Sequence, residues 1–191
     1  MIERIEEVLK DLLADPALAV REAASEAMDR TVAKRSLGTF RERLRGGDPE
    51  EKIRAVYAAG EIGGAEGVSL LMEALSDGSE EIRGVAARTL GLFPTPSVLK
   101  ALWEMLPRER GVVLGNLLEA LGVSGRRELA PHVEKYMAHP EGEVRGKAVI
   151  AYSRLTDAAG WEKIMALRGD PDVTVRAAVA AALGNWTSAR P

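Results

Sequence analysis

The amino-acid sequence predicts an all-α protein, folded as a right-handed α-solenoid of about six helical hairpins. Three observations lead to this prediction. One seven-residue phrase recurs at a near-constant spacing, and small or apolar residues follow it at intervals of three and four. Hydrophobic residues make up 46% of the chain, whereas aromatic residues make up only 4%. A core made mostly of aliphatic side chains suits closely packed helices.

The recurring phrase is Asp-Pro-x-x-x-(Val/Ile)-Arg, and five copies keep most of it. They read DPALAVR at 15–21, DPEEKIR at 48–54, DGSEEIR at 77–83, HPEGEVR at 139–145 and DPDVTVR at 170–176, with a degenerate copy, RERGVVL, at 108–114. The last residue of each copy is its anchor, and successive anchors lie 33, 29, 31, 31 and 31 residues apart. This period matches one helix pair of a solenoid. A single domain over residues 1–191 is therefore expected, with repeats at approximately 1–31, 32–64, 65–93, 94–124, 125–155 and 156–191.

Each copy of the phrase has the chemistry of a helix start. Asp accepts free backbone N–H groups and Pro is tolerated in the first helical turn, so we expect the phrase to cap the second helix of each hairpin. Glycine is a suitable helix stop. Three glycines stand eight residues past their anchors and are expected to end these helices: Gly91, Gly122 and Gly184.

With its continuation, the pattern DPxxxVRxxAAxALG resembles the HEAT-like repeat that is also found in phycobilisome lyases. The resemblance covers essentially the whole chain, and it implies a ladder of ion pairs between the Asp and Arg residues of neighbouring repeats. The fourth repeat departs from this pattern, with Arg108 in the Asp position and Leu114 in the Arg position, and the fifth carries His139 in the Asp position. This interruption either changes the curvature, forms a hinge, or reflects neutral drift.

Composition and motifs predict a non-catalytic, cytoplasmic protein. The 26 basic and 29 acidic side chains give a formal charge of -3, which supplies no general attraction for nucleic acid or an anionic membrane. Cysteine is absent, and we expect neither a signal peptide nor a membrane span. His132 and His139 are not followed by Glu, unlike the repeated His-Glu pairs that hold two metals in HEAT-repeat di-iron hydroxylases. Nucleophile signatures and phosphate-binding glycine loops are also missing, so neither catalysis nor a cofactor is expected.

A helical wheel separates a buried arc of each second helix from an open arc, which comprises the positions two before and one, two and five after the anchor. Second helices commonly line the concave side of HEAT-like stacks, so the open arc is the candidate interaction surface. Its residues are Glu26, Lys52, Glu81, Gly84, Arg88, Gly115, Asn116, Glu119, Glu143, Gly146, Lys147 and Ile150. The three glycines all stand one residue past the anchor. They either form a smooth groove that a partner approaches or permit tight packing between repeats.

The predicted function is therefore a scaffold that binds another protein on the second-helix face. Two alternatives stay open: an accessory subunit of a bilin lyase or another enzyme, and a nucleic-acid-binding HEAT-like protein, which the acidic balance disfavours. Self-association through the sixth repeat is a further expectation. No charged cover follows its second helix, so Trp186, another subunit or another domain is expected to close it.

Overall fold

The computed structural model describes residues 2–185, apart from the side chains of Ile2, Ala33, Lys34 and Ala159. Within these residues there are eleven α-helices and no strand, which confirms the predicted all-α repeat fold. The chain divides into two compact units, one up to Leu70 and one from Leu71. None of the described helices is both long and apolar enough to span a membrane.

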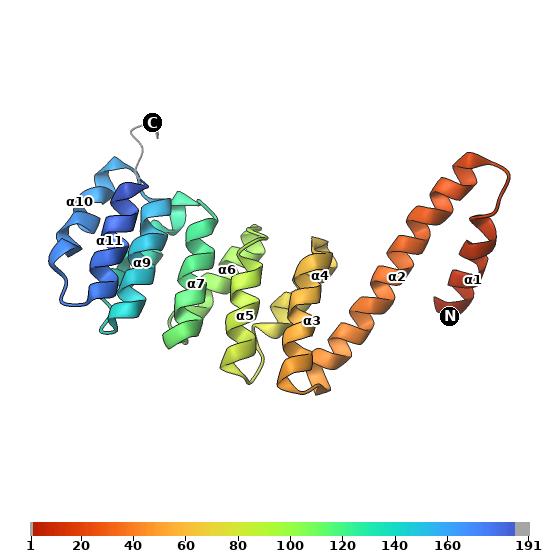
Figure 1. Cartoon of the computed structure of the whole chain (residues 1–191), viewed down its shortest axis with the longest axis horizontal. Helices are drawn as coiled ribbons and strands as arrows, with labels where there is room; N and C mark the ends of the chain where they lie inside the picture. The colour runs from red at the N-terminus through yellow and green to blue at the C-terminus, as the bar shows by residue number, and fades with distance from the viewer. Residues whose placement is uncertain (1, 186–191) are drawn as a thin grey trace. The chain divides into compact units, whose positions relative to one another are not determined.

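The first unit is built around one long helix, α2 (Leu18–Gly46), which has 29 residues. α1 (Ile2–Leu12) packs beside its N-terminal half and α3 (Pro49–Ile62) packs near its C-terminal end (Figure 1). α4 (Gly64–Ala74) follows α3, and its residues from Leu71 onward belong to the second unit. Few side chains of α2 are buried, and these are Ala24, Leu37 and Leu44.

α2 continues without a turn near residue 32, where a boundary between two repeats is expected. Between Leu18 and Leu37 the sequence offers neither proline nor glycine, and the position eight past the first anchor holds Asp29. Hydroxyl side chains in this region bond back to the carbonyl four residues earlier, which keeps them compatible with a helix. They belong to Thr31, Ser36 and Thr39. The first two repeats therefore share one helix.

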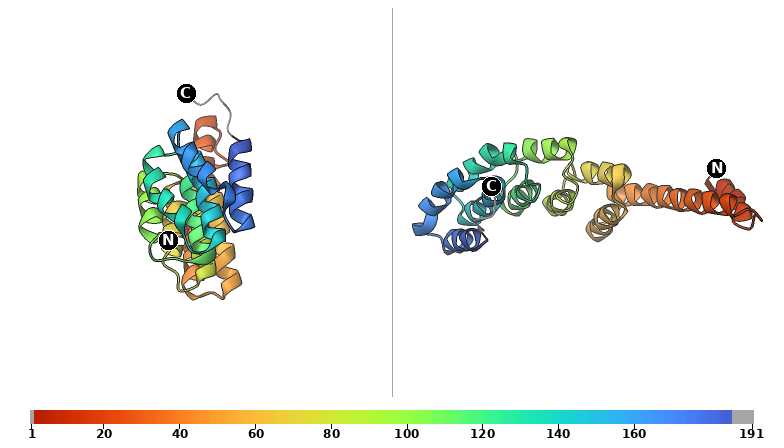
Figure 2. Two further views of the ribbon diagram at one scale, coloured as in Figure 1. Left: turned by 90° about the vertical axis from the view of Figure 1, so that its left-hand side faces the viewer. Right: turned by 90° about the horizontal axis from the view of Figure 1, so that it is seen from above.

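The second unit repeats one hairpin along its length. Its second helices are α5 (Glu80–Leu90), α7 (Gly111–Val123), α9 (Gly142–Leu155) and α11 (Val173–Gly184). Its first helices are α6 (Pro96–Met105), α8 (Ala130–Glu134) and α10 (Trp161–Ala166). Short 3-10 helices flank α8 and α10 at Arg127–Leu129, Lys135–Ala138, Ala158–Gly160 and Leu167–Gly169. Each second helix packs against the next, and together they form the inner row of this unit (Figure 2, right).

The core of the second unit consists of aliphatic side chains. The largest fully buried ones include Leu71, Ile82, Leu90, Leu102, Leu114, Leu117, Leu118, Leu121, Leu155 and Ile164. Of the tryptophans, Trp161 begins α10 and is buried, whereas Trp103 is 38% exposed and stacks on His132. Trp186, which was expected to cover the last second helix, lies outside the described residues.

The recurring phrase mostly forms a turn in front of the helix, and the expectation that it caps the helix is correct only for Asp48. In four other copies the helix begins three residues after the first position. There the first side chain accepts a bond from the backbone N–H two residues on, at 2.8 Å in Asp15, Asp77 and Asp170 and at 3.2 Å in His139. Asp readily forms this local turn, and the histidine ring nitrogen reproduces it.

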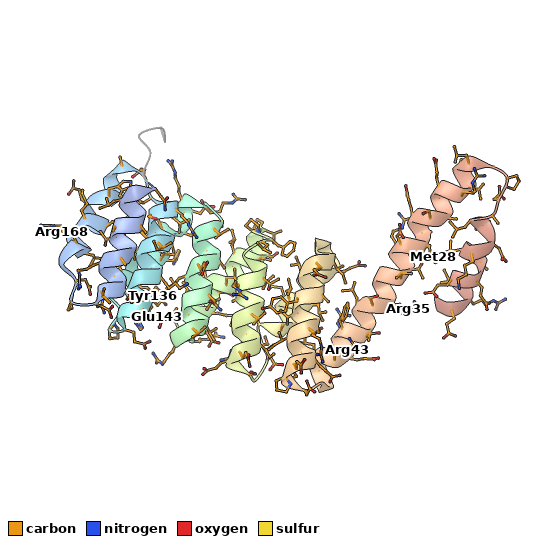
Figure 3. The ribbon with its side chains drawn as sticks, viewed as in Figure 1. Met28, Arg35, Arg43, Tyr136, Glu143 and Arg168 are labelled. Carbon is orange, nitrogen blue, oxygen red and sulfur yellow. The ribbon has the colours of Figure 1, made fainter. Side chains whose placement is uncertain are left out.

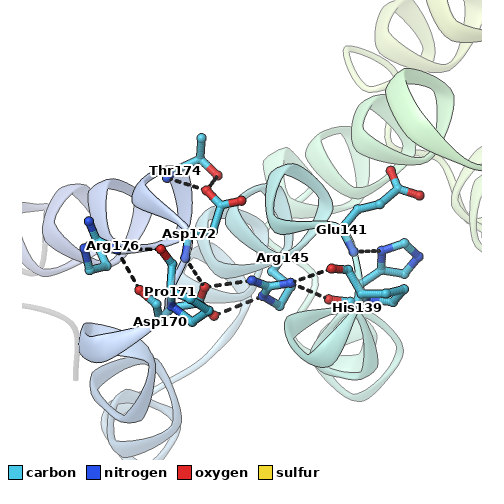
Figure 4. Close-up of polar contacts among 9 residues, drawn as sticks. His139, Glu141, Arg145, Asp170, Pro171, Asp172, Thr174 and Arg176 are labelled. Carbon is cyan, nitrogen blue, oxygen red and sulfur yellow. Dashed lines mark hydrogen bonds and ion pairs between the residues drawn. The ribbon is translucent and has the colours of Figure 1, made fainter.

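Arg145 connects two neighbouring repeats. Its Nη1 donates to the carbonyls of His139 and Pro140 in its own repeat. Its Nε and Nη2 donate to the carboxylate of Asp170 in the next repeat, at 3.0 and 2.7 Å (Figure 4). These last bonds raise the pKa of Arg145 and lower the pKa of Asp170. The predicted ladder is confirmed at this link.

The predicted interruption in the fourth repeat is only half present. The Nε and Nη2 of Arg83 donate to Glu109 at 2.7 and 3.0 Å, and these hydrogen bonds raise the pKa of Arg83. Glu109 directly follows Arg108, so the carboxylate has moved by one residue and is not lost. The arginine is lost, because Leu114 is apolar and buried. The ladder pair is therefore present between α5 and α7 and absent between α7 and α9.

Glycines eight residues past the anchor mark close contacts between second helices. Gly91 is the C-cap of α5, but Gly122 lies inside α7, so the expectation that Gly122 ends its helix is wrong. A Cβ at Gly91 would lie 3.0 Å from the Cα of Ala120, and one at Gly122 would lie 2.7 Å from the Cα of Ala151. Glycine is needed because any side chain would press on the neighbouring backbone.

Candidate functional site

Seven of the twelve predicted surface residues gather on α7 and α9, where they line two hollows. They are Gly115, Asn116, Glu119, Glu143, Gly146, Lys147 and Ile150. The wheel positions that they share bring them together, because equivalent positions on stacked second helices face the same side. These two hollows are the candidate functional site.

The larger hollow lies between α9 and α11 and measures about 390 Å³. Most of its lining is small or apolar: Gly146, Ile150, Thr174, Ala177, Ala178 and Ala181. Three charged side chains complete the lining, and these are Glu119, Glu143 and Lys147. An apolar pocket with a few polar groups is the usual form of a ligand site.

The charges around the larger hollow leave a negative excess. Lys147 and Glu119 form an ion pair, with Nζ 3.0 Å from Oε2. Glu143 lies exposed in the first turn of α9 (labelled in Figure 3). Within residues 2–185, no side chain makes an ion pair or hydrogen bond with the Glu143 carboxylate. The hollow therefore favours a ligand with a positive charge.

The smaller hollow, of about 100 Å³, lies between α7 and α9 and shares Glu143 and Lys147 with the larger one. Asn116 lines it and donates from Nδ2 to the carbonyl of Gly84 at 2.9 Å. This bond fixes the Asn116 amide against α5. The smaller hollow is thus a polar extension of the larger one along the second-helix face.

The three glycines one residue past the anchors are buried and face the next second helix. A Cβ at Gly84 would lie 3.3 Å from the Nδ2 of Asn116, and one at Gly146 would lie 3.3 Å from the carbonyl oxygen of Thr174. At Gly115 the nearest atom would be 3.6 Å away, which is an ordinary contact. These distances favour the packing alternative for Gly84 and Gly146.

Four residues of α11 that line the larger hollow were not among the predicted surface residues. They are Thr174, Ala177, Ala178 and Ala181. They stand two before and one, two and five after Arg176, which are the positions that defined the surface in the other repeats. The signal was therefore present in the sixth copy of the phrase.

Five predicted surface residues line neither hollow. Glu81 and Arg88 are exposed on α5, and Gly84 is buried against α7. In the first unit, Glu26 is exposed on α2 and Lys52 is half-buried on α3. Their place in an interaction surface stays a prediction.

The donor groups in the described part of the chain do not fit a metal centre. No three His, Asp or Glu side chains in it are placed so that they could hold an ion together. His132 stacks on Trp103 with the ring centroids 4.5 Å apart. His139 uses Nδ1 in the turn before α9. Both histidines therefore have structural contacts.

The fold and the second-helix face define the protein as an α-solenoid of stacked helical hairpins. The family described as HEAT repeats matches residues 37–122. This part of the chain therefore consists of HEAT repeats, and the resemblance seen in the sequence is confirmed.

Known proteins similar to this chain include two deoxyhypusine hydroxylases and a phycocyanin lyase complex. Deoxyhypusine hydroxylase of Drosophila pseudoobscura pseudoobscura is 27% identical over 108 residues, covering 56% of this chain and 36% of that protein. Human deoxyhypusine hydroxylase in complex with glycerol is 24% identical with a TM-score of 0.56, covering 80% of this chain and 62% of that one. The complex of CpcE and CpcF of phycocyanin lyase from Nostoc sp. PCC7120 is 21% identical with a TM-score of 0.56, covering 94% and 76%. The solved structures share the fold, and the chain spans about a third of its curated relatives' length.

These comparisons contradict the expectation of a non-catalytic scaffold. Both curated relatives and a similar structure bear the name of an enzyme, deoxyhypusine hydroxylase. The expectation rested on missing His-Glu pairs and missing nucleophile signatures. Such motifs report reacting groups, whereas a surface that binds an enzyme's substrate carries no fixed motif.

Proposed function

We propose that this chain takes part in the enzymatic modification of a protein, and that its larger hollow binds a cationic aliphatic side chain of that substrate. The observation that carries the proposal is the combination of an apolar lining with the Glu143 carboxylate, which has no partner among residues 2–185. The names of the relatives support the same substrate class. Deoxyhypusine is a lysine extended by an aminobutyl group, so it joins a long methylene chain to positive charge.

The lining explains how such a side chain would be held. Methylene groups would lie against Ile150, Ala178 and Ala181, and each buried methylene contributes about 0.8 kcal/mol. The cationic end would lie beside Glu143. The ammonium group of Lys147 would repel the cationic end of the ligand. That end would therefore lie toward Glu143 and away from Lys147.

Fluorescence anisotropy of a labelled protein that carries deoxyhypusine, compared with the same protein carrying unmodified lysine, tests the proposal. The deoxyhypusine form should bind more tightly to the full chain. Ala181→Trp fills the hollow from an exposed position and should raise the Kd at least about tenfold. Glu143→Gln should raise it about twofold to fivefold, as expected for a solvent-accessible ion pair.

Ala166→Trp is the matched control, because Ala166 is an exposed alanine of α10 that does not line the hollow. It should bind like the wild type. Equal affinity for the two labelled proteins, or wild-type affinity in Ala181→Trp, would show that the hollow is not the substrate site.

A further inference from the structure

Arg176 is held like Arg145 but has only half of its partners. Its Nη1 donates to the carbonyls of Asp170 and Pro171 at 2.8 and 2.9 Å (Figure 4). In Arg145 the same arrangement directs Nε and Nη2 to a carboxylate of the next repeat. Among residues 2–185, no group accepts a hydrogen bond from these two atoms of Arg176. Arg176 is therefore preorganised for a carboxylate that the described chain does not bring to it.

Asp15 is the matching acceptor. Its Oδ1 accepts the backbone N–H two residues on at 2.8 Å, as Oδ1 of Asp170 does. Arg21 holds the carbonyl of Asp15 just as Arg176 holds the carbonyl of Asp170. Within the described residues no arginine pairs with the Asp15 carboxylate. The turn that receives Arg145 is thus repeated, with an open carboxylate, in front of α2.

The helix faces beside Arg176 and Asp15 also match. Gly122 of α7 packs against Ala151, which stands six residues past the next anchor. The equivalent glycine of α11 is Gly184, where a Cβ would meet nothing within 4 Å in the described structure. The residue six past the anchor on α2 is Ala27, which is half-buried. The two surfaces therefore have the small residues that an internal link uses.

The rest of both faces is small or apolar and open to solvent. α11 exposes Val173, Ala177, Ala180 and Gly184, whose spacing of four, three and four keeps them on one side. At the internal link, a Cβ at Gly146 would lie 3.3 Å from the carbonyl oxygen of Thr174 and 3.7 Å from the Cβ of Ala178, which stand two before and two after their anchor. The same positions on α2 hold exposed alanines, Ala19 and Ala23.

We propose that two copies of this chain associate head to tail. α11 of one copy packs against the beginning of α2 of the other, and Arg176 forms a bidentate pair with the partner subunit's Asp15. A second copy is the occupant because this chain itself carries both the open donor and the open acceptor, each next to a complementary helix face. The interface joins two different surfaces, so it repeats from copy to copy.

Sedimentation velocity of the full chain from about 1 µM to about 1 mM tests the association. The wild type should grow in mass with concentration. Arg176→Gln and Asp15→Asn should each raise the Kd of association at least about tenfold, because each removes one charge of a desolvated pair. Asp15→Asn keeps the local turn, since the amide oxygen still accepts.

Mixing the two variants identifies the interface. Arg176→Gln retains Asp15, and Asp15→Asn retains Arg176, so an equimolar mixture should form a 1:1 dimer that grows no further. Arg54→Gln is the control, because Arg54 pairs within its own helix with Glu50, and it should associate like the wild type.

Three outcomes would overturn the proposal. The first is a wild type that stays monomeric throughout, as expected if residues 186–191 or a different protein cover α11. The second is association that neither variant weakens. The third is a mixture of folded variants, checked by circular dichroism, that remains monomeric.

Discussion

The link between α9 and α11 and the link between α7 and α9 are neighbours in the second unit, yet they are built differently. Arg145 and Asp170 join the first, with side chains only 13% and 7% exposed. At the second, Leu114 replaces the arginine and is buried in α7 together with Val113, Leu117, Leu118 and Leu121. The helices pack against each other at both links. Stacking therefore depends on apolar burial, which both links share, and does not require the ladder pair.

The comparison of the two links also shows how a ladder ion pair can be lost without a large loss of stability. Removing one member of a buried ion pair leaves an unpaired charge, whereas replacing both members by uncharged groups is often neutral. At the α7–α9 link both members are replaced, by Leu114 and by His139. His139 accepts the backbone N–H of Glu141 at Nδ1, so the Asp position at this link carries no carboxylate that would need an arginine.

Inserting a guanidinium into the apolar link should have the largest effect. Leu114→Arg should lower the free energy of unfolding of the second unit by roughly 3–5 kcal/mol, because a buried charge then lacks a carboxylate. Adding His139→Asp supplies that carboxylate and should restore about 0.5–3 kcal/mol. Urea unfolding followed by tryptophan fluorescence measures both, since Trp103 and Trp161 lie in this unit. Strictly additive effects of the two substitutions would show that no pair forms.

Two glycines of α7 differ in their surroundings: Gly122 lies in the close contact with α9, whereas Gly115 lines the smaller hollow. Gly122→Ala should lower the free energy of unfolding by about 1–3 kcal/mol, because its Cβ would press on the backbone of Ala151. Gly115→Ala should raise it by up to about 1 kcal/mol, because its Cβ would meet only the Cγ of Lys147 at 3.6 Å. The same urea titration compares them. Similar losses at both positions would mean that the hollow is as crowded as the helix contact.

Lowering the pH should have the smallest effect on stability, and it acts on the ion pair between α9 and α11. Hydrogen bonds from Arg145 hold the pKa of Asp170 in the folded protein below its ordinary value. The stabilisation by Asp170 is therefore fully present above the unfolded-state pKa of about 3.9, and it is lost as the pH falls through the lower folded-state pKa. The difference in unfolding free energy between the wild type and Asp170→Asn should shrink accordingly on acidification.

Glu104→Gln is the control for this acid titration. Glu104 is exposed and lies 3.9 Å from Lys100 in the same helix, so the substitution should change stability little at either pH. A difference between the wild type and Asp170→Asn that persists unchanged to about pH 2 would show that the charge of Asp170 is not what stabilises the link.

Much of the candidate site was predictable from spacing. The anchors gave the register of each second helix, and the wheel then placed residues such as Glu119 and Ile150 on one face. Applied to the sixth copy, the same rule also identifies Ala178 and Ala181. Glu109 was not predictable in this way, because a shift of one residue in a loop breaks the pattern while the carboxylate still reaches Arg83.

The sequence by itself determined the hairpin period and the residues that share a face of each second helix, because both follow from 3.6 residues per helical turn. Only the tertiary structure decided how closely Gly122 approaches Ala151 and how large the hollow beside Ile150 is. These features depend on distances between helices of different repeats. Such distances are set by the packing of many side chains at once, and no local sequence pattern predicts the combined result of that packing.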